Sequence, residues 1–76
     1  MNIFVIDKAT KKNLGIIDFI PNRQDRIMLK IVVDGTWTDS ECIVESIFYY
    51  PENHGILVFV SVVEPYYYNM IKDIEW

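Results

Sequence analysis

The residue types that most often carry nucleophilic chemistry occur once each in this chain, as Cys42 and His54. A catalytic dyad needs a thiol or hydroxyl beside a histidine that a third group orients. His54 lies in the segment 51–55, whose Pro-Glu-Asn-His-Gly composition is typical of a turn. Cys42 lies in an apolar run, where a lone cysteine behaves as a small hydrophobic residue of low reactivity. We therefore expect no catalytic residues and a protein that is not an enzyme.

Metal and cofactor ligands are equally scarce. A structural zinc site needs four Cys or His ligands, and the chain contains only one of each. Asp34, Asp39 and Glu41 lie close together in the sequence, but their spacing does not match a calcium-binding loop. The three glycines fall in turn patterns, and none belongs to a phosphate-binding loop. We expect neither a metal nor a cofactor.

Aromatic and acidic residues gather in the second half of the chain. Residues 1–38 carry six basic and four acidic side chains, whereas residues 39–76 carry one basic and seven acidic ones. Tyr and Trp dominate the energetic centres of protein interfaces because each gives a large rigid contact and a polar group. The sequence therefore predicts an acidic, tyrosine-rich surface that binds a protein with a basic surface. Its candidate contact residues are Glu41, Glu45, Tyr49, Tyr66, Tyr67, Tyr68 and Trp76.

The basic first half supports a second interpretation, a small nucleic-acid-binding β-barrel. Basic side chains near aromatic residues can follow a single-stranded backbone. The residues available for this are Lys8, Lys11, Lys12, Arg23 and Arg26. A net charge of −4 opposes binding to phosphates, so nucleic acid is the less favoured partner.

Length and composition limit the remaining possibilities. Seventy-six residues allow a single domain, 1–76, and a hydrophobic content of 51% excludes intrinsic disorder. One cysteine, no targeting segment and no apolar run of membrane-spanning length predict a cytoplasmic protein. Small chains rich in Ile, Asn, Lys and Tyr are typical of AT-rich phages and mobile elements. Such proteins often inhibit or adapt a host enzyme, and we expect a viral host-interaction protein of that kind.

Most of the chain favours β-strands. Two apolar runs flank a polar loop at 7–13 and predict a hairpin. Residues 26–34 show the clearest alternation in the chain, with Ile27, Leu29, Ile31 and Val33 on one face. Asp34-Gly35 then predicts a tight hairpin turn. Residues 56–63 are apolar on both faces, which predicts a central strand covered on both sides.

Two segments are ambiguous. Residues 39–50 fit either an amphipathic helix or a strand, and their Ile, Val, Phe and Tyr content favours a hairpin of 41–50 with 56–64. Residues 66–75 fit a helix, and 66–76 also fit a strand. We expect an all-β fold, a small antiparallel meander of five or six strands curled into a barrel-like sheet; the alternative is an α+β fold with a helix at 39–50 or 66–75. The two-sided strand also predicts a twofold homodimer whose interface includes part of 65–76.

Overall fold

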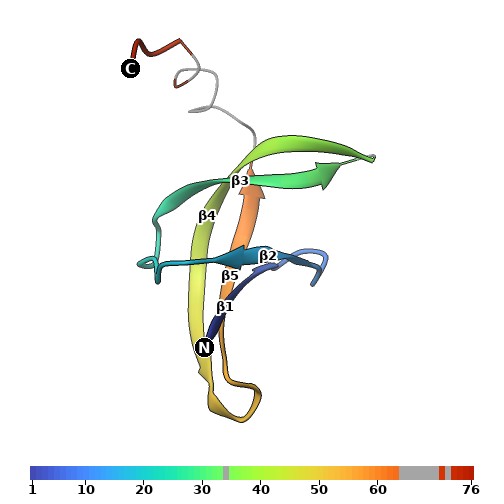
Figure 1. Ribbon diagram of the computed structural model, residues 1–76, viewed down its shortest axis with the longest axis vertical. Helices are drawn as coiled ribbons and strands as arrows, with labels where there is room; N and C mark the ends of the chain where they lie inside the picture. The colour runs from blue at the N-terminus through green and yellow to red at the C-terminus, as the bar shows by residue number, and fades with distance from the viewer. Residues whose placement is uncertain (34, 64–70, 72) are drawn as a thin grey trace.

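The computed structural model describes residues 1–33, 35–63, 71 and 73–76. Its strands are β1 (Asn2–Asp7), β2 (Asn13–Ile17), β3 (Arg26–Val33), β4 (Thr36–Tyr50) and β5 (Gly55–Val63), with a 3-10 turn at Pro51–Asn53. They form one sheet in the order β2-β1-β5-β4-β3 (Figure 1). The all-β, barrel-like fold is confirmed, and residues 39–50 belong to a strand rather than to a helix. The segment 64–70, which includes the three consecutive tyrosines, lies outside the described residues.

The three predicted hairpins are all present as antiparallel pairs. In the β3–β4 pair, Val33 lies opposite Thr36, so residues 34–35 are the whole connection. Gly35 has a φ of 78°, a left-handed conformation that glycine adopts without steric cost. One feature differs from the expected antiparallel meander: β1 lies parallel to β5, so the sheet is mixed. The central position of β5 agrees with its two apolar faces.

The long strand β4 curls the sheet. Its first half pairs with β3 and its second half pairs with β5, so the two partners are staggered along it. The β4–β5 register shifts between Val44 and Ser46, and a bulge of this kind bends a strand and increases its twist. The β2–β3 connection is held beside this bulge by two backbone hydrogen bonds: Gln24 N–H donates to the Val44 carbonyl, and Val44 N–H donates to the Asp25 carbonyl.

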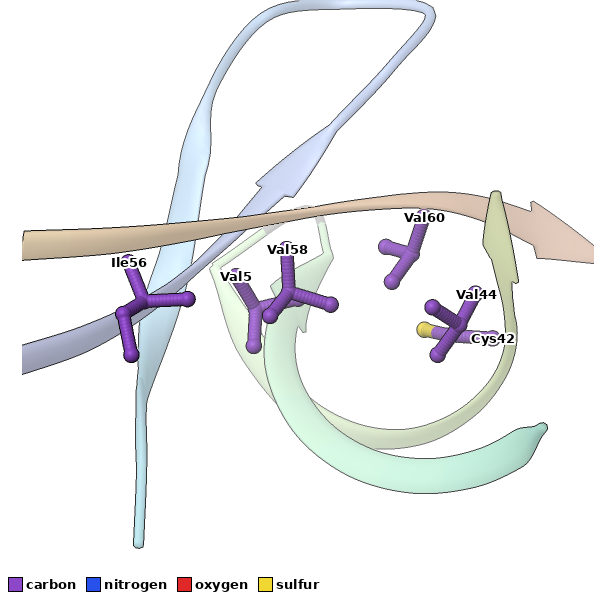
Figure 2. Close-up of a cluster of buried hydrophobic side chains, with 6 residues drawn as sticks. All are labelled: Val5, Cys42, Val44, Ile56, Val58 and Val60. Carbon is purple, nitrogen blue, oxygen red and sulfur yellow. The ribbon is translucent and has the colours of Figure 1, made fainter. Parts of the chain in front are cut away.

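The core occupies the concave side of the curled sheet. Its buried side chains gather beneath β5 and inside the arc of the curled strands (Figure 2). They are Val5, Cys42, Val44, Ile56, Val58 and Val60. Half-buried side chains of the edge strands, including Leu14, Ile17, Ile27 and Leu29, pack against this cluster. Among the described residues, no helix has the length and hydrophobicity needed to cross a bilayer.

Candidate functional site

The outer side of the sheet carries a row of large apolar side chains. The strand registers place Ile16 of β2 opposite Phe4 of β1, Phe4 opposite Leu57 of β5, and Leu57 opposite Phe48 of β4. Neighbouring residues Val5 and Val58 belong to the concave core, and successive side chains in a strand point to opposite faces. The row therefore lies on the outer face. We call Phe4, Ile16, Phe48, Leu57 and the adjacent Phe59 the outer apolar face.

The centre of this face is packed, and its ends are open. Phe4 and Leu57 are half-buried, whereas Ile16 is 62% exposed and Phe48 is 57% exposed. Phe48 and Phe59 make an edge-to-face contact with ring centroids 5.6 Å apart. Gly55 allows the tight packing at the centre, because a Cβ atom there would lie 3.2 Å from Cε2 of Phe4. The aromatic rings are therefore held in place before any partner binds.

A small pocket adjoins the outer apolar face. It is lined by Phe48, Phe59, Ser46, Lys8 and Glu45, with a volume of about 210 Å³. The Ser61 hydroxyl donates a 2.9 Å hydrogen bond to Oε1 of Glu45, which fixes the carboxylate at the pocket edge. The pocket thus joins an aromatic wall to one acidic and one basic side chain. This combination suits recognition of a protein surface with an apolar centre and charged rim.

Four of the seven predicted contact residues are among the described residues, and they differ in exposure. Glu41 is buried, with 2% exposure, and its Oε2 accepts a 2.7 Å hydrogen bond from Nη1 of Arg26. Glu41 therefore does not contribute to an exposed acidic surface. Glu45 is half-buried, and Tyr49 and Trp76 are exposed. Tyr66, Tyr67 and Tyr68 lie outside the described residues.

The predicted basic residues are also divided. Lys8, Lys11 and Lys12 follow β1, in a turn that Asp7 holds through hydrogen bonds from Ala9 N–H and the Thr10 hydroxyl. Arg23 Nε donates a 3.2 Å hydrogen bond to the Glu45 carbonyl, and Arg26 pairs with Glu41. Both arginines therefore make contacts within the fold, and the three lysines are exposed.

Cys42 and His54 lie at opposite ends of the β4–β5 pair. Cys42 is opposite Val62, and His54 precedes Gly55. The intervening length of β5 is about 23 Å at roughly 3.3 Å per residue. Burial, with Asp7 and Glu41 nearby, raises the pKa of the Cys42 thiol to about 11. His54 has a φ of 51° in the turn, as predicted for a turn residue. The described residues contain no cluster of three His, Cys, Asp or Glu side chains that could hold a metal ion.

Sequence reasoning missed the outer apolar face as a unit. The two-sided apolar pattern of 56–63 indicated that a second face existed, but Phe4 and Ile16 join it only through the parallel β1–β5 pairing. Comparison of the chain with protein-family models, curated proteins and solved structures gave no match.

Proposed function

We propose that this chain is a non-enzymatic protein-binding module whose contact surface is the outer apolar face. The observation that carries the proposal is the register-aligned row Ile16–Phe4–Leu57–Phe48, which ends in two largely exposed side chains. Four neighbouring strands spaced about 4.8 Å apart make this row about 14 Å wide. Contiguous apolar surface on a small protein commonly marks an interaction site.

The chemistry of the partner follows from the surroundings of this face. Glu45 and Lys8 border the pocket beside Phe48, and the exposed Glu52, in the turn that follows β4, adds a second carboxylate. Together with the net charge of −4, these carboxylates favour a partner with an apolar centre and a basic rim. A second copy carries the same negative charge and is disfavoured as the occupant of this face.

A small module of this kind would act by occupying a surface of a larger protein, as an inhibitor or an adaptor. We place this activity in the cytoplasm, since the lone thiol is buried and the chain has no cysteine pair to oxidise. A phage or mobile-element protein acting on a host enzyme is the biological setting we propose, on the strength of composition alone.

A photocrosslinking experiment tests the proposal. Benzoylphenylalanine replaces Phe48 on the outer apolar face, and in a matched control it replaces Phe19, an exposed aromatic residue after β2 that belongs to no proposed surface. Irradiation in the native cytosol is expected to give an adduct with one other protein from position 48 and not from position 19. The double reversal Glu45→Lys/Glu52→Lys should reduce that adduct severalfold, because the rim charges would then repel the partner.

Two results would overturn the proposal. One is that position 48 gives no adduct, or an adduct with a second copy alone. The other is that positions 19 and 48 capture the same protein with equal yield, since the outer apolar face would then have no special role.

Nucleic-acid binding remains the alternative function, and one observation supports it. Lys12 and the exposed Trp37 line the same cavity, so a cation and a stacking surface lie close together. Against it stand the engagement of Arg23 and Arg26 within the fold and the negative net charge.

A further inference from the structure

A second surface, separate from the outer apolar face, lies between the two edges of the curled sheet. Strands β2 and β3 occupy the ends of the strand order, and the curl brings the start of β2 to the end of β3. The groove between them has a volume of about 410 Å³. Its lining is made by Lys12, Asn13, Leu14, Ile31, Val32 and Trp37.

Strand β3 offers this groove a backbone edge. Within the described residues, β3 pairs only with β4, along eight residues that include neither glycine nor proline. Alternate N–H and C=O groups of such an edge point away from the sheet and can accept another strand. The β2 edge is less open near the groove, because the Asn13 side chain already accepts a 2.9 Å hydrogen bond from Gly15 N–H. A sixth strand would therefore pair along β3.

The side chains around the groove determine which pattern of side chains an added strand needs. Ile31 is buried and Leu14 is half-buried, so the floor is apolar and continues into the core. Lys12 lies at the groove, and the exposed Lys30 precedes Ile31 on β3. An extended segment fits if apolar side chains alternate with acidic ones. The apolar set would then face the floor, and the acidic set would face the lysines.

The chain contains one described segment with this pattern, at residues 73–76. Ile74 and Trp76 alternate with Asp73 and Glu75. Ile74 is 49% exposed, and Trp76 is 97% exposed, so the Trp76 side chain in particular is open to contact from another chain. The Ile74 N–H donates a hydrogen bond to the Ile71 carbonyl in a local turn. Ile71 lines a pocket with Arg26 and Met28, near the start of β3, whereas the groove lies at the end of β3.

We propose that the groove between β2 and β3 binds residues 73–76 of a second copy of this chain, which add to β3 as a sixth strand. The exchange is reciprocal, since each copy offers one groove and one segment, and the resulting dimer has twofold symmetry. Trp76 fills the groove beside Trp37 and Leu14, while Asp73 and Glu75 lie near Lys12 and Lys30. Four paired residues make a small contact, so the dimer forms reversibly at micromolar concentrations.

Sedimentation velocity over a low- to high-micromolar concentration series tests this inference. The wild-type chain is expected to show a reversible monomer–dimer equilibrium. Trp76→Ser should weaken dimerisation at least tenfold, whereas Tyr49→Ser, at an exposed aromatic residue on the β4–β5 hairpin, should leave it unchanged. Because Trp76 is exposed, the Trp76→Ser variant should fold like the wild type. Circular dichroism verifies that its strands are retained.

A charge exchange identifies the contact. Lys12→Glu/Lys30→Glu and Asp73→Lys/Glu75→Lys should each weaken the dimer. In an equimolar mixture of the two double variants, the acidic groove matches the basic segment and the unchanged groove matches the unchanged segment, so heterodimers should form through both grooves. A wild-type monomer at high micromolar concentration would overturn the inference, as would a dimer unaffected by Trp76→Ser.

Binding of a single-stranded oligonucleotide at physiological salt, detected by Trp37 fluorescence in the Trp76→Ser variant, would instead assign the groove to nucleic acid. None of these results depends on crosslinking at position 48, so the two proposals fail separately.

Discussion

Arg26 and Glu41 form an ion pair diagonally across the β3–β4 ladder. Arg26 Nη1 lies 2.7 Å from Glu41 Oε2, although the register places Ile43 opposite Arg26 and Met28 opposite Glu41. The Arg26 side chain is half-exposed, and the Glu41 side chain is buried. A buried carboxylate is tolerated only when it is paired and hydrogen-bonded. The pair therefore helps to fix the register of β3, since a slip by one residue would turn every side chain of the strand to the other face.

Removal of Arg26 should destabilise the fold. Arg26→Ala leaves the Glu41 carboxylate buried without this guanidinium, and we expect the free energy of unfolding to fall by about 2 kcal/mol, below the full cost of breaking a buried pair because Arg26 is half-exposed. Urea denaturation followed by circular dichroism measures the loss. The double variant Arg26→Met/Glu41→Leu should lie within about 1 kcal/mol of wild type, because apolar groups can replace a buried pair. Equal stability of Arg26→Ala and wild type would contradict this account.

The contact between Phe4 and Gly55 should make position 55 sensitive to a single methyl group. A Cβ at Gly55 would lie 3.2 Å from Cε2 of Phe4, closer than an ordinary van der Waals contact, and 3.4 Å from Cδ2, at the lower limit of ordinary contact. We expect Gly55→Ala to lower the free energy of unfolding by about 1 kcal/mol, the lower end of the cost of overpacking. Phe4→Leu in the Gly55→Ala background should recover part of the loss, and a double-mutant cycle from urea denaturation tests this coupling. Additive effects would show that the ring does not restrict position 55.

The Cys42 thiol should make stability depend on alkaline pH. Its pKa in the native state is about 11, against an ordinary value of 9.0. Below pH 9 the thiol is protonated in both states, so it adds no pH dependence. Between pH 9 and 11 the unfolded chain releases the proton while the native chain keeps it, so stability falls as pH rises. The total loss is on the order of 2 kcal/mol.

The measurement is the free energy of unfolding from pH 8 to pH 11 for wild type and Cys42→Ala. The variant should be less stable at pH 8 because a buried side chain is truncated, and its stability should fall less steeply over this range. Iodoacetamide at pH 8 should label wild-type Cys42 only after urea unfolds the chain. Rapid labelling of the native protein would show that the thiol is accessible and ionised.

Binding to generic DNA should be weak. Arg23 and Arg26 are engaged within the fold, and the net charge of −4 repels phosphates. Fluorescence anisotropy with labelled single- and double-stranded oligonucleotides should detect no submicromolar complex at physiological salt. Submicromolar binding that weakens steeply with added salt would favour the nucleic-acid function over protein binding.

The local elements of this protein follow from its sequence. The alternation over 26–34 predicts β3, and Asp34-Gly35 predicts the hairpin that joins β3 to β4. The composition of 41–50 predicts a strand, although its periodicity also fits a helix. The roles of Cys42 as a buried hydrophobic residue and of His54 as a turn residue are equally local. Each of these features depends on residues within a few positions of one another. Residue type and spacing therefore predict them directly.

Tertiary structure alone decided the parallel pairing of β1 with β5, the burial of Glu41 and the assembly of the outer apolar face. No turn joins β1 to β5, and a parallel register between strands almost fifty residues apart leaves no local signal. The sequence predicts that Glu41 is an exposed acidic residue, but in the folded sheet it is buried and paired with Arg26. Phe4, Leu57 and Phe48 become one surface only when three strands align. Packing between distant segments determines these features. Side chains from several strands must together fill the interior and pair its buried charge.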